Sequence, residues 1–190
     1  MIAQLPLPAT LDDLMKVEGK AELIGGRVVK NMASGELPSE VAFEIAVSLR
    51  EHIRTNKLDG KAYADGVGYA IDPPLTSTRE SFQPDASYYS GMMPVNRMRF
   101  IEGPPTFAVE VRSENDYGRT ADREYAGKRD DYFEAGTMVV WDVDPLAKTI
   151  TKYVRSALTQ GTRFPIGEQA DAEPAVPGWK LDLETLFGQD

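Results

Sequence analysis

The amino-acid sequence predicts an α/β fold in which helices flank a mixed β-sheet and a β-hairpin stands near the N-terminus. Three observations favour this class. Strand-like and helix-like segments alternate along the chain, a Gly-Gly pair separates two short strand-like runs near its start, and a second strand pair follows near its end. We expect residues 1–190 to form a single domain, large enough to fold without a disulfide or metal.

The first predicted elements are a short helix and a hairpin. Residues 10–18 are typical of a helix with Thr10 as its N-cap. The runs Glu22-Leu23-Ile24 and Arg27-Val28-Val29 then lie on either side of Gly25-Gly26, a pair that favours a tight turn. These runs therefore predict a β-hairpin.

A long helix and two strands are predicted next. Residues 38–56 carry apolar side chains at helical spacing on one side, at Val41, Ile45, Leu49 and Ile53. Residues 67–71 and 83–89 are strand-like, and the intervening residues 72–80 have the composition of a mobile loop. Residues 91–104 are expected to be irregular.

The C-terminal half contains the clearest strand, residues 106–112, which is rich in β-branched and aromatic side chains. Residues 120–135 are predicted to form a helix, and residues 137–143 and 149–154 a second hairpin. A short terminal helix is expected through Leu186-Phe187.

The composition limits the possible chemistry. The chain has no cysteine, which excludes thiolate zinc sites, iron–sulfur clusters, cysteine nucleophiles and disulfides. Its one histidine, His52, cannot build a multi-histidine metal site within one chain, disfavours a Ser-His-Asp triad and is not expected to be catalytic. Hydrolytic chemistry would therefore come from carboxylates, lysine, arginine or a hard cation held by oxygen ligands.

The net charge of −9 argues against a general nucleic-acid coat protein, because nonspecific affinity needs clustered lysine and arginine. It still permits a nuclease whose basic residues line one cleft. No signal peptide and no apolar run of about 18 residues is present, so the sequence predicts a cytoplasmic protein without a membrane partner.

Two charged residues share one face of the predicted strand 106–112. Side chains alternate along a strand, which places Glu110 and Arg112 on the same face as Ala108. A lone charge would be costly there, so these groups must be paired, metal-bound or at the open end of the sheet. A plain Glu–Arg pair at a strand edge is the alternative.

The following helix presents a lysine to the sheet. Its inward-facing stripe has spacings of four, three, four and three residues and consists of Ala121, Tyr125, Lys128, Tyr132 and Ala135. Asp131 is expected to point elsewhere. An inward lysine needs a carboxylate within reach. Alternatively, the stem of Lys128 packs while its amine extends into solvent.

Two further acids complete the candidate site. Asp85 follows Pro84 at the start of a strand, and Glu22 lies in the first hairpin. Either acid alone could be an ordinary surface residue. Together with Glu110 and Lys128 they suggest a Mg²⁺ site, because two acids on adjacent strand ends can hold the ion and a nearby lysine can orient the attacking water.

The pair Pro84-Asp85 and the run Glu110-Val111-Arg112 resemble the PD-(D/E)XK nuclease superfamily, with Arg112 in place of the usual lysine. More specifically, the chain resembles the Uma-two family of restriction-endonuclease-like proteins, formerly a domain of unknown function. The matching segments cover nearly the whole chain in order: Ala21-Glu22-Leu23-Ile24-Gly25-Gly26, Gln83-Pro84-Asp85, Pro104 to Ser113, Asp122, Lys128, Tyr132, Gly136, Trp141 to Pro145, Pro177-Gly178-Trp179 and Leu181-Asp182-Leu183.

This resemblance implies a restriction-endonuclease-like core and a set of site residues. Asp85 and Glu110 would be the metal ligands, aided by the Val111 carbonyl, and Lys128 the catalytic lysine, moved from the strand to the next helix. Glu22 corresponds to the family's early acidic residue. The resemblance also implies a homodimer. Where the family commonly has a histidine, at the start of the long helix, this chain has Ser39 and Glu40.

The roles of the arginines stay open. Arg112 either contacts phosphate or neutralises Glu110, and the loop residues Arg97, Arg99 and Arg119 either touch a phosphate backbone or are simply solvated.

The leading hypothesis is a Mg²⁺-dependent endonuclease, with Mn²⁺ as a possible substitute and DNA as the expected substrate. Its catalytic set is Asp85, Glu110, Lys128, Glu22 and Arg112. The alternative is a noncatalytic interaction module that keeps the nuclease fold in a defence or mobile-element system, which the acidic charge and Arg112 favour. A metal hydrolase for another phosphoester is a third hypothesis.

Overall fold

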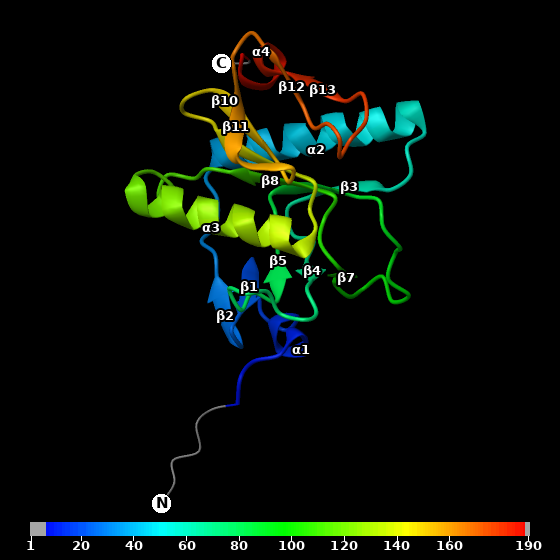
Figure 1. Cartoon of the computed structure of the whole chain (residues 1–190), viewed down its shortest axis with the longest axis vertical. Helices are drawn as coiled ribbons and strands as arrows, with labels where there is room; N and C mark the ends of the chain where they lie inside the picture. The colour runs from blue at the N-terminus through cyan, green and yellow to red at the C-terminus, as the bar shows by residue number, and fades with distance from the viewer. Residues whose placement is uncertain (1–6, 189–190) are drawn as a thin grey trace, which may run out of the picture.

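The computed structural model describes residues 7–188, apart from the side chains of residues 158 and 159. Its main sheet has six strands in the order β11-β10-β9-β8-β6-β3 (Figure 1). These strands are β3 (Lys61–Ala64), β6 (Ala86–Tyr89), β8 (Phe107–Val111), β9 (Val139–Asp144), β10 (Thr149–Val154) and β11 (Ala157–Pro165). Strands β8 and β9 are parallel and all other neighbours are antiparallel, which confirms the predicted mixed sheet.

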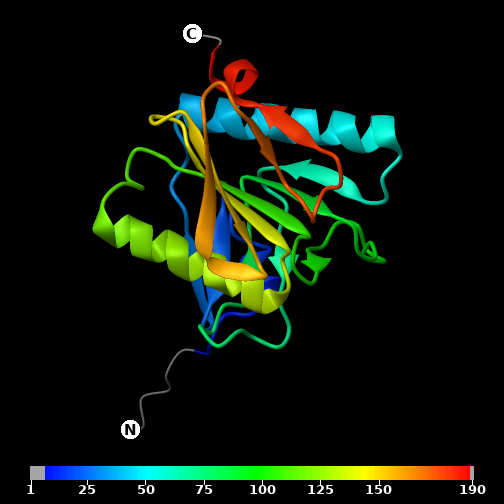
Figure 2. The same ribbon diagram turned by 45° about the horizontal axis from the view of Figure 1, so that its top comes forward.

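Two helices cover the opposite faces of this sheet (Figures 1 and 2). Helix α2 (Glu36–Asn56) packs over β3, β6 and β8, while α3 (Arg119–Ala135) lies on the other face. Helix α3 connects β8 to β9, and such a crossover is what parallel neighbours require. The sheet is therefore flanked by helices, as the sequence predicts.

The side chains of β8 alternate between two hydrophobic cores, one on each face of the sheet. Phe107, Val109 and Val111 belong to the core beneath α2, whereas Ala108 packs with Tyr132 in the core beneath α3. Glu110 shares the face of Ala108. The charged side of β8 therefore faces α3.

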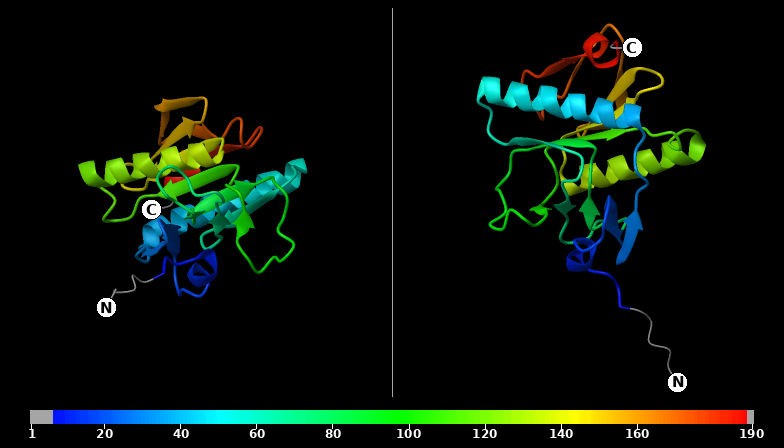
Figure 3. Two further views of the ribbon diagram at one scale, coloured as in Figure 1. Left: turned by 60° about the horizontal axis from the view of Figure 1, so that its bottom comes forward. Right: turned by 180° about the vertical axis from the view of Figure 1, so that it is seen from behind.

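Two small β-structures lie on the α3 side of the sheet (Figures 1 and 3). The N-terminal hairpin consists of β1 (Ala21–Ile24) and β2 (Arg27–Lys30), and its pairing confirms the prediction. A three-stranded sheet in the order β5-β4-β7 consists of β4 (Tyr69–Ala70), β5 (Ser81–Phe82) and β7 (Ile101–Glu102). The Leu23 N–H donates to Ser81 Oγ at 2.7 Å, and the Glu80 N–H donates to the Leu23 carbonyl at 2.9 Å. The hairpin is thus tied to the segment that leads into β6.

Several predicted boundaries are corrected by tertiary structure. Helix α1 (Leu11–Leu14) has the predicted Thr10 cap but ends earlier than residue 18. Helix α2 begins two residues before Pro38, with Gly35 as N-cap. The predicted strand 83–89 is shortened to β6, which begins at Ala86, because Pro84 lacks the N–H that a continuous ladder needs.

Strands with weak local signals were not predicted. Strand β3 has a short, alanine-rich sequence, and β11 contains Gly161 and several polar residues, so both depend on pairing with a neighbouring strand. The same is true of β7, within residues 91–104, and of the pair β12 (Gln169–Asp171) and β13 (Lys180–Asp182). The chain then forms α4 (Leu183–Phe187), the expected terminal helix.

Within residues 7–188, none of the helices combines the length and the apolar character that a membrane crossing requires.

A cluster of aromatic rings anchors the C-terminal segment to the α2 side of the sheet. Trp179 stacks on Trp141 with ring centroids 4.9 Å apart and meets Phe107 edge-on at 5.8 Å. Its indole N–H donates to Ser48 Oγ on α2 at 3.2 Å. Trp179 therefore links the tail, the sheet and α2.

We predict that Trp179→Ala lowers the free energy of unfolding by about 3–5 kcal/mol, because it removes a large buried side chain and leaves a cavity. Urea unfolding followed by circular dichroism measures the loss. Met98→Ala is the control, since Met98 is 91% exposed and its truncation is expected to change stability by less than about 0.5 kcal/mol. Equal losses in the two variants would contradict this description of the core.

Candidate active site

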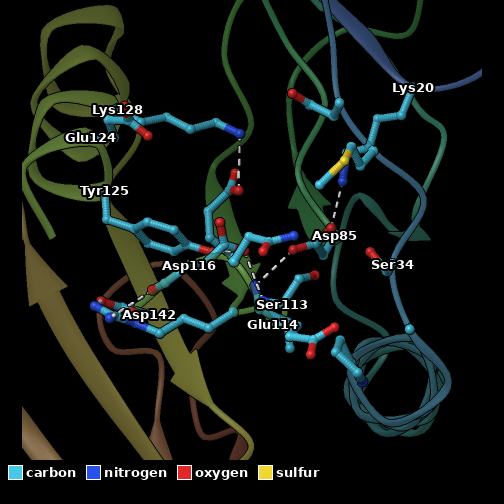
Figure 4. Close-up of a pocket in the computed structure, with 18 of the residues that line it drawn as sticks. Lys20, Ser34, Asp85, Ser113, Glu114, Asp116, Glu124, Tyr125, Lys128 and Asp142 are labelled. Carbon is cyan, nitrogen blue, oxygen red and sulfur yellow. Dashed lines mark hydrogen bonds and ion pairs between the residues drawn. The ribbon is translucent and has the colours of Figure 1, made fainter. Parts of the chain in front are cut away.

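A pocket of about 1070 Å³ opens between the N-terminal hairpin, α3 and the ends of β8 and β9 (Figure 4). Every residue that the sequence predicts for the site lines this pocket: Glu22, Asp85, Glu110, Val111, Arg112 and Lys128. These residues come from segments up to about a hundred positions apart, and the fold brings them to one place.

The two predicted metal ligands lie on neighbouring strands. Asp85 immediately precedes β6, and its N–H donates to the Val109 carbonyl at 3.0 Å, which continues the β6–β8 ladder to the level of Glu110. Asp85 Oδ2 also accepts the Val111 N–H at 2.7 Å. The Val111 N–H thus holds one oxygen of the Asp85 carboxylate at the end of β8.

Glu110 is a buried carboxylate that accepts two side-chain hydrogen bonds. Lys128 Nζ lies 2.9 Å from Oε2, and the Tyr132 hydroxyl donates to Oε1 at 2.6 Å. Burial raises the pKa of Glu110, and the negative charges of Asp85 and Glu22 raise it further, against the opposing effect of Lys128. This acid therefore gains from any additional positive charge in the pocket.

Lys128 lies between two acids instead of extending into solvent. Its Nζ is 3.0 Å from Glu22 Oε1 as well as 2.9 Å from Glu110 Oε2. Burial lowers the pKa of Lys128, but Glu110 and Glu22 outweigh burial and the pKa is raised. The side chain is consequently an ammonium group, and Figure 4 shows it extending from α3 into the pocket.

Glu22 connects this lysine to an arginine. Arg79 donates to Glu22 and to Asp131 Oδ2, the latter at 2.8 Å, and Glu22 Oε1 accepts the Gln83 N–H at 3.0 Å. Burial raises the pKa of Glu22, yet Lys128 and Arg79 outweigh it and the pKa is lowered. The expectation that Asp131 points away from the site network is wrong: its carboxylate is buried and neutralises Arg79.

Lys20 is a site residue that sequence reasoning missed. Its ammonium contacts Asp85 Oδ1 (Figure 4) and also lies 3.1 Å from Asp65 Oδ1, a residue outside the pocket lining. Burial lowers the pKa of Lys20, but Asp85 and Glu110 raise it more strongly. The two-residue period of a strand could have predicted it, because Lys20 lies two residues before Glu22 and therefore on the same face. In the structure the Lys20 carbonyl accepts the Asn31 N–H at 2.9 Å, which extends the hairpin ladder to this residue.

Arg112 pairs with acids other than Glu110. Its guanidinium donates to both oxygens of Asp142, at 2.9 and 2.8 Å, and to Asp122 at 2.9 Å, and it stacks 4.9 Å from the Tyr125 ring centre. Asp142 lies opposite Glu110 in the β8–β9 register. The alternative of a simple Glu110–Arg112 pair is therefore wrong. The acids that Arg112 neutralises are instead Asp142 and Asp122, and a contact of Arg112 with phosphate stays a prediction.

The other basic and titratable residues considered from the sequence lie outside the pocket. Arg97, Arg99 and Arg119 are not among the lining residues, and Arg99 pairs with Asp12 on α1. His52 is bonded to the Pro177 carbonyl at 3.0 Å, on the opposite face of the sheet.

The donor set can be compared with what a metal ion needs. Within residues 7–188, no group of three or more His, Cys, Asp or Glu side chains is arranged to hold an ion. Asp85 and Glu110 with the Val111 carbonyl would supply three oxygen donors, and Mg²⁺ commonly keeps several waters beside one or two carboxylates. The Lys20 ammonium on Asp85 also shows that the pocket holds a cation at this carboxylate. The residues present therefore fit a hydrated hard cation.

Comparison with known proteins agrees with the architecture. The family model Uma2, described as "Putative restriction endonuclease", matches residues 8–184. The chain is also similar to the crystal structure of a putative nuclease belonging to DUF820 from Anabaena variabilis ATCC 29413. That similarity has a TM-score of 0.73 and 17% sequence identity, over 95% of this chain and 98% of the other. At this identity it shows the fold, and it confirms the predicted fold class. No curated protein matches the chain.

We predict that Glu22→Gln lowers stability at pH 7 by about 3 kcal/mol, because it weakens the compensation of two buried cations. The folded-state pKa of Glu22 is lowered, so its contribution is present above the ordinary value of 4.5 and is lost as the pH falls through the folded value. The difference in unfolding free energy between wild type and variant should therefore narrow as the pH falls below 4.5 and through the folded-state pKa of Glu22. Urea unfolding across a pH series measures this difference.

Glu18→Gln is the matched control, because Glu18 is an exposed acid in the same segment. It should follow the wild type at every pH. A Glu22→Gln protein as stable as the wild type at pH 7 would refute the role given to this carboxylate.

Proposed function

Because this chain belongs to the Uma2 family of putative restriction endonucleases, the family that its sequence resembles, we propose that it is a metal-dependent endonuclease that hydrolyses phosphodiester bonds in DNA. One observation carries the proposal: Asp85, Glu110 and Lys128, which are distant in sequence, line one pocket, where Lys128 pairs with Glu110 and the charge of Asp85 raises the pKa of Glu110.

In this proposal Asp85, Glu110 and the Val111 carbonyl hold Mg²⁺ or Mn²⁺. The ion, when bound, would polarise a phosphoryl oxygen and favour the hydroxide form of a bound water. The chain's own contribution is to hold these oxygens in place. The Val111 N–H fixes one Asp85 oxygen and the Tyr132 hydroxyl fixes one Glu110 oxygen, so neither carboxylate must reorganise.

Lys128 would position the nucleophilic water or stabilise charge on the phosphoryl group. An ammonium has three donors, and Glu110 and Glu22 accept two of them. The third donor is then available to a water or a phosphate oxygen in the pocket. Because its pKa is raised, Lys128 acts as a fixed donor and not as a general base.

In this proposal, Lys20 pairs with Asp85 while no metal ion is bound. Asp65 is a second carboxylate for the same ammonium, at 3.1 Å, so Lys20 can leave Asp85 without losing its own compensation. We infer that Lys20 balances Asp85 until another cation takes its place.

The second candidate function is a noncatalytic interaction module with the nuclease fold. It is favoured by the acidic character of the pocket, which eight acidic and six basic residues line, and by Arg112, whose charge is neutralised by Asp142 and Asp122. Such a module would need neither metal nor cleavage, so the two experiments below separate the candidates. The homodimer and the cytoplasmic location stay predictions.

We predict that the purified protein nicks or linearises supercoiled plasmid DNA with Mg²⁺ or Mn²⁺, and that Lys128→Met lowers the rate at least about a hundredfold. Glu110→Gln should have an equal or larger effect. Gel electrophoresis measures cleavage, and circular dichroism shows whether each variant keeps its fold.

Lys16→Met is the matched control, since Lys16 is a surface lysine on the α1 side whose amine pairs with Asp13. It should cleave like the wild type. A folded wild type without metal-dependent cleavage, or a Lys128→Met variant as active as the wild type, would contradict the proposed function.

We predict that Mn²⁺ binds to the wild type in isothermal titration calorimetry and that Asp85→Asn abolishes this binding, because the amide brings no negative charge to the ion. Asp12→Asn is the control, since Asp12 is an exposed acid paired with Arg99 away from the pocket. Equal Mn²⁺ binding by wild type and Asp85→Asn would exclude Asp85 as a ligand and favour the noncatalytic module.

A further inference from the structure

The cations of the pocket differ in whether an acid already neutralises them. The basic lining residues are Lys20, Lys30, Arg79, Arg112, Lys128 and Arg129. Four of them have carboxylate partners within the pocket or beside it: Lys20, Arg79, Arg112 and Lys128. Their positive charge is largely balanced before any substrate arrives. An anionic ligand is therefore attracted most strongly by a cation without an acidic partner.

Arg129 is such a cation. Among residues 7–188 it forms no ion pair, and its guanidinium carbon lies 3.7 Å from the centre of the Tyr153 ring on β10. Its Nε is buried and has no hydrogen-bond partner in this part of the chain, whereas the residue as a whole is half-buried. The guanidinium is thus packed on the aromatic ring, and the side chain also lines the open pocket.

This arrangement suits a phosphate group. A guanidinium presents two terminal N–H groups side by side, which match two phosphate oxygens. The Tyr153 ring limits the motion of the side chain, so less conformational freedom is lost on binding. Lys30 also lacks an acidic partner among the described residues, but it is exposed on β2 with no such support.

The position of Arg129 separates it from the reacting bond. It follows Lys128 on α3, about 100° around the helix, and leans on β10, while Lys128 points to Glu110 on β8. A phosphate held by Arg129 is therefore a different one from the phosphate beside Asp85 and Glu110.

We propose that Arg129, supported by Tyr153, binds a backbone phosphate of the nucleic acid that neighbours the bond to be cut. The inference rests on the proposed nuclease function and names the residue that holds the substrate strand. In an acidic protein, this unpaired guanidinium would contribute one charge contact to the attraction of the phosphate backbone.

Salt-dependent DNA binding tests the assignment. Fluorescence anisotropy of a labelled DNA 20-mer, as a duplex and as a single strand, is measured without divalent ions so that no cleavage occurs. Arg129→Gln should weaken binding about tenfold or more and reduce the slope of log affinity against log salt by about 0.9 for the duplex or about 0.7 for the single strand. A merely structural role would not change this slope.

Two further variants isolate the cause. Arg155→Gln removes the same charge from an exposed residue two positions after Tyr153, outside the pocket. The salt dependence of its DNA binding should have the wild-type slope. Tyr153→Leu keeps the charge of Arg129 but removes its support, so affinity should fall by a smaller factor at an unchanged slope. Thermal unfolding confirms that each variant is folded.

The possible failures can be told apart. If the wild type binds DNA and Arg129→Gln shows the wild-type affinity and slope, the assignment of Arg129 is overturned while the proposed function stands. If the wild type binds neither form of DNA, both are overturned.

Discussion

The structure depends on keeping buried carboxylates neutralised. Asp131, Arg79, Glu22, Lys128 and Glu110 form a continuous series of ion pairs, and Lys20 neutralises Asp85 beside it. Unpaired, each of these buried acids would cost several kcal/mol. With four carboxylates against three cations, the network has one negative group in excess. That excess is the physical reason why a further cation is expected in the pocket.

The fold supplies this network from elements that are far apart along the chain. The hairpin contributes Glu22 and Lys20, the loop before β5 contributes Arg79, and α3 carries Lys128 and Asp131 across the face of β8. The parallel β8–β9 pair makes the crossover through α3 necessary, and that crossover sets the lysine over Glu110. Topology and charge balance therefore support each other, since each acid lies on one element and its cation on another.

Periodicity in the sequence was enough to predict part of the site. The strand period placed Glu110 away from the α2 core, and the helical stripe placed Lys128 toward the sheet, and both positions agree with the structure. Lys20, Arg79 and Asp131 could not be paired in this way, because their partners are 45 or more residues away in sequence. Strands β3, β11, β12 and β13 were missed for a related reason: their short or polar sequences become strands only through a neighbour. Local sequence patterns thus predict which way a side chain points. Ion pairs and strand pairs between distant residues can be identified only once the fold is known.

The most direct measurement of the central claim is a crystal structure with bound Mn²⁺, located by its anomalous scattering. The account predicts one peak between Asp85, Glu110 and the Val111 carbonyl. The distances from the ion to these oxygens should be about 2.1 Å, as Mg²⁺ adopts with oxygen ligands. It also predicts that Lys20 has moved from Asp85 toward Asp65. A peak at another place, or Mn²⁺-soaked crystals with no peak and Lys20 still on Asp85, would contradict a shared metal site.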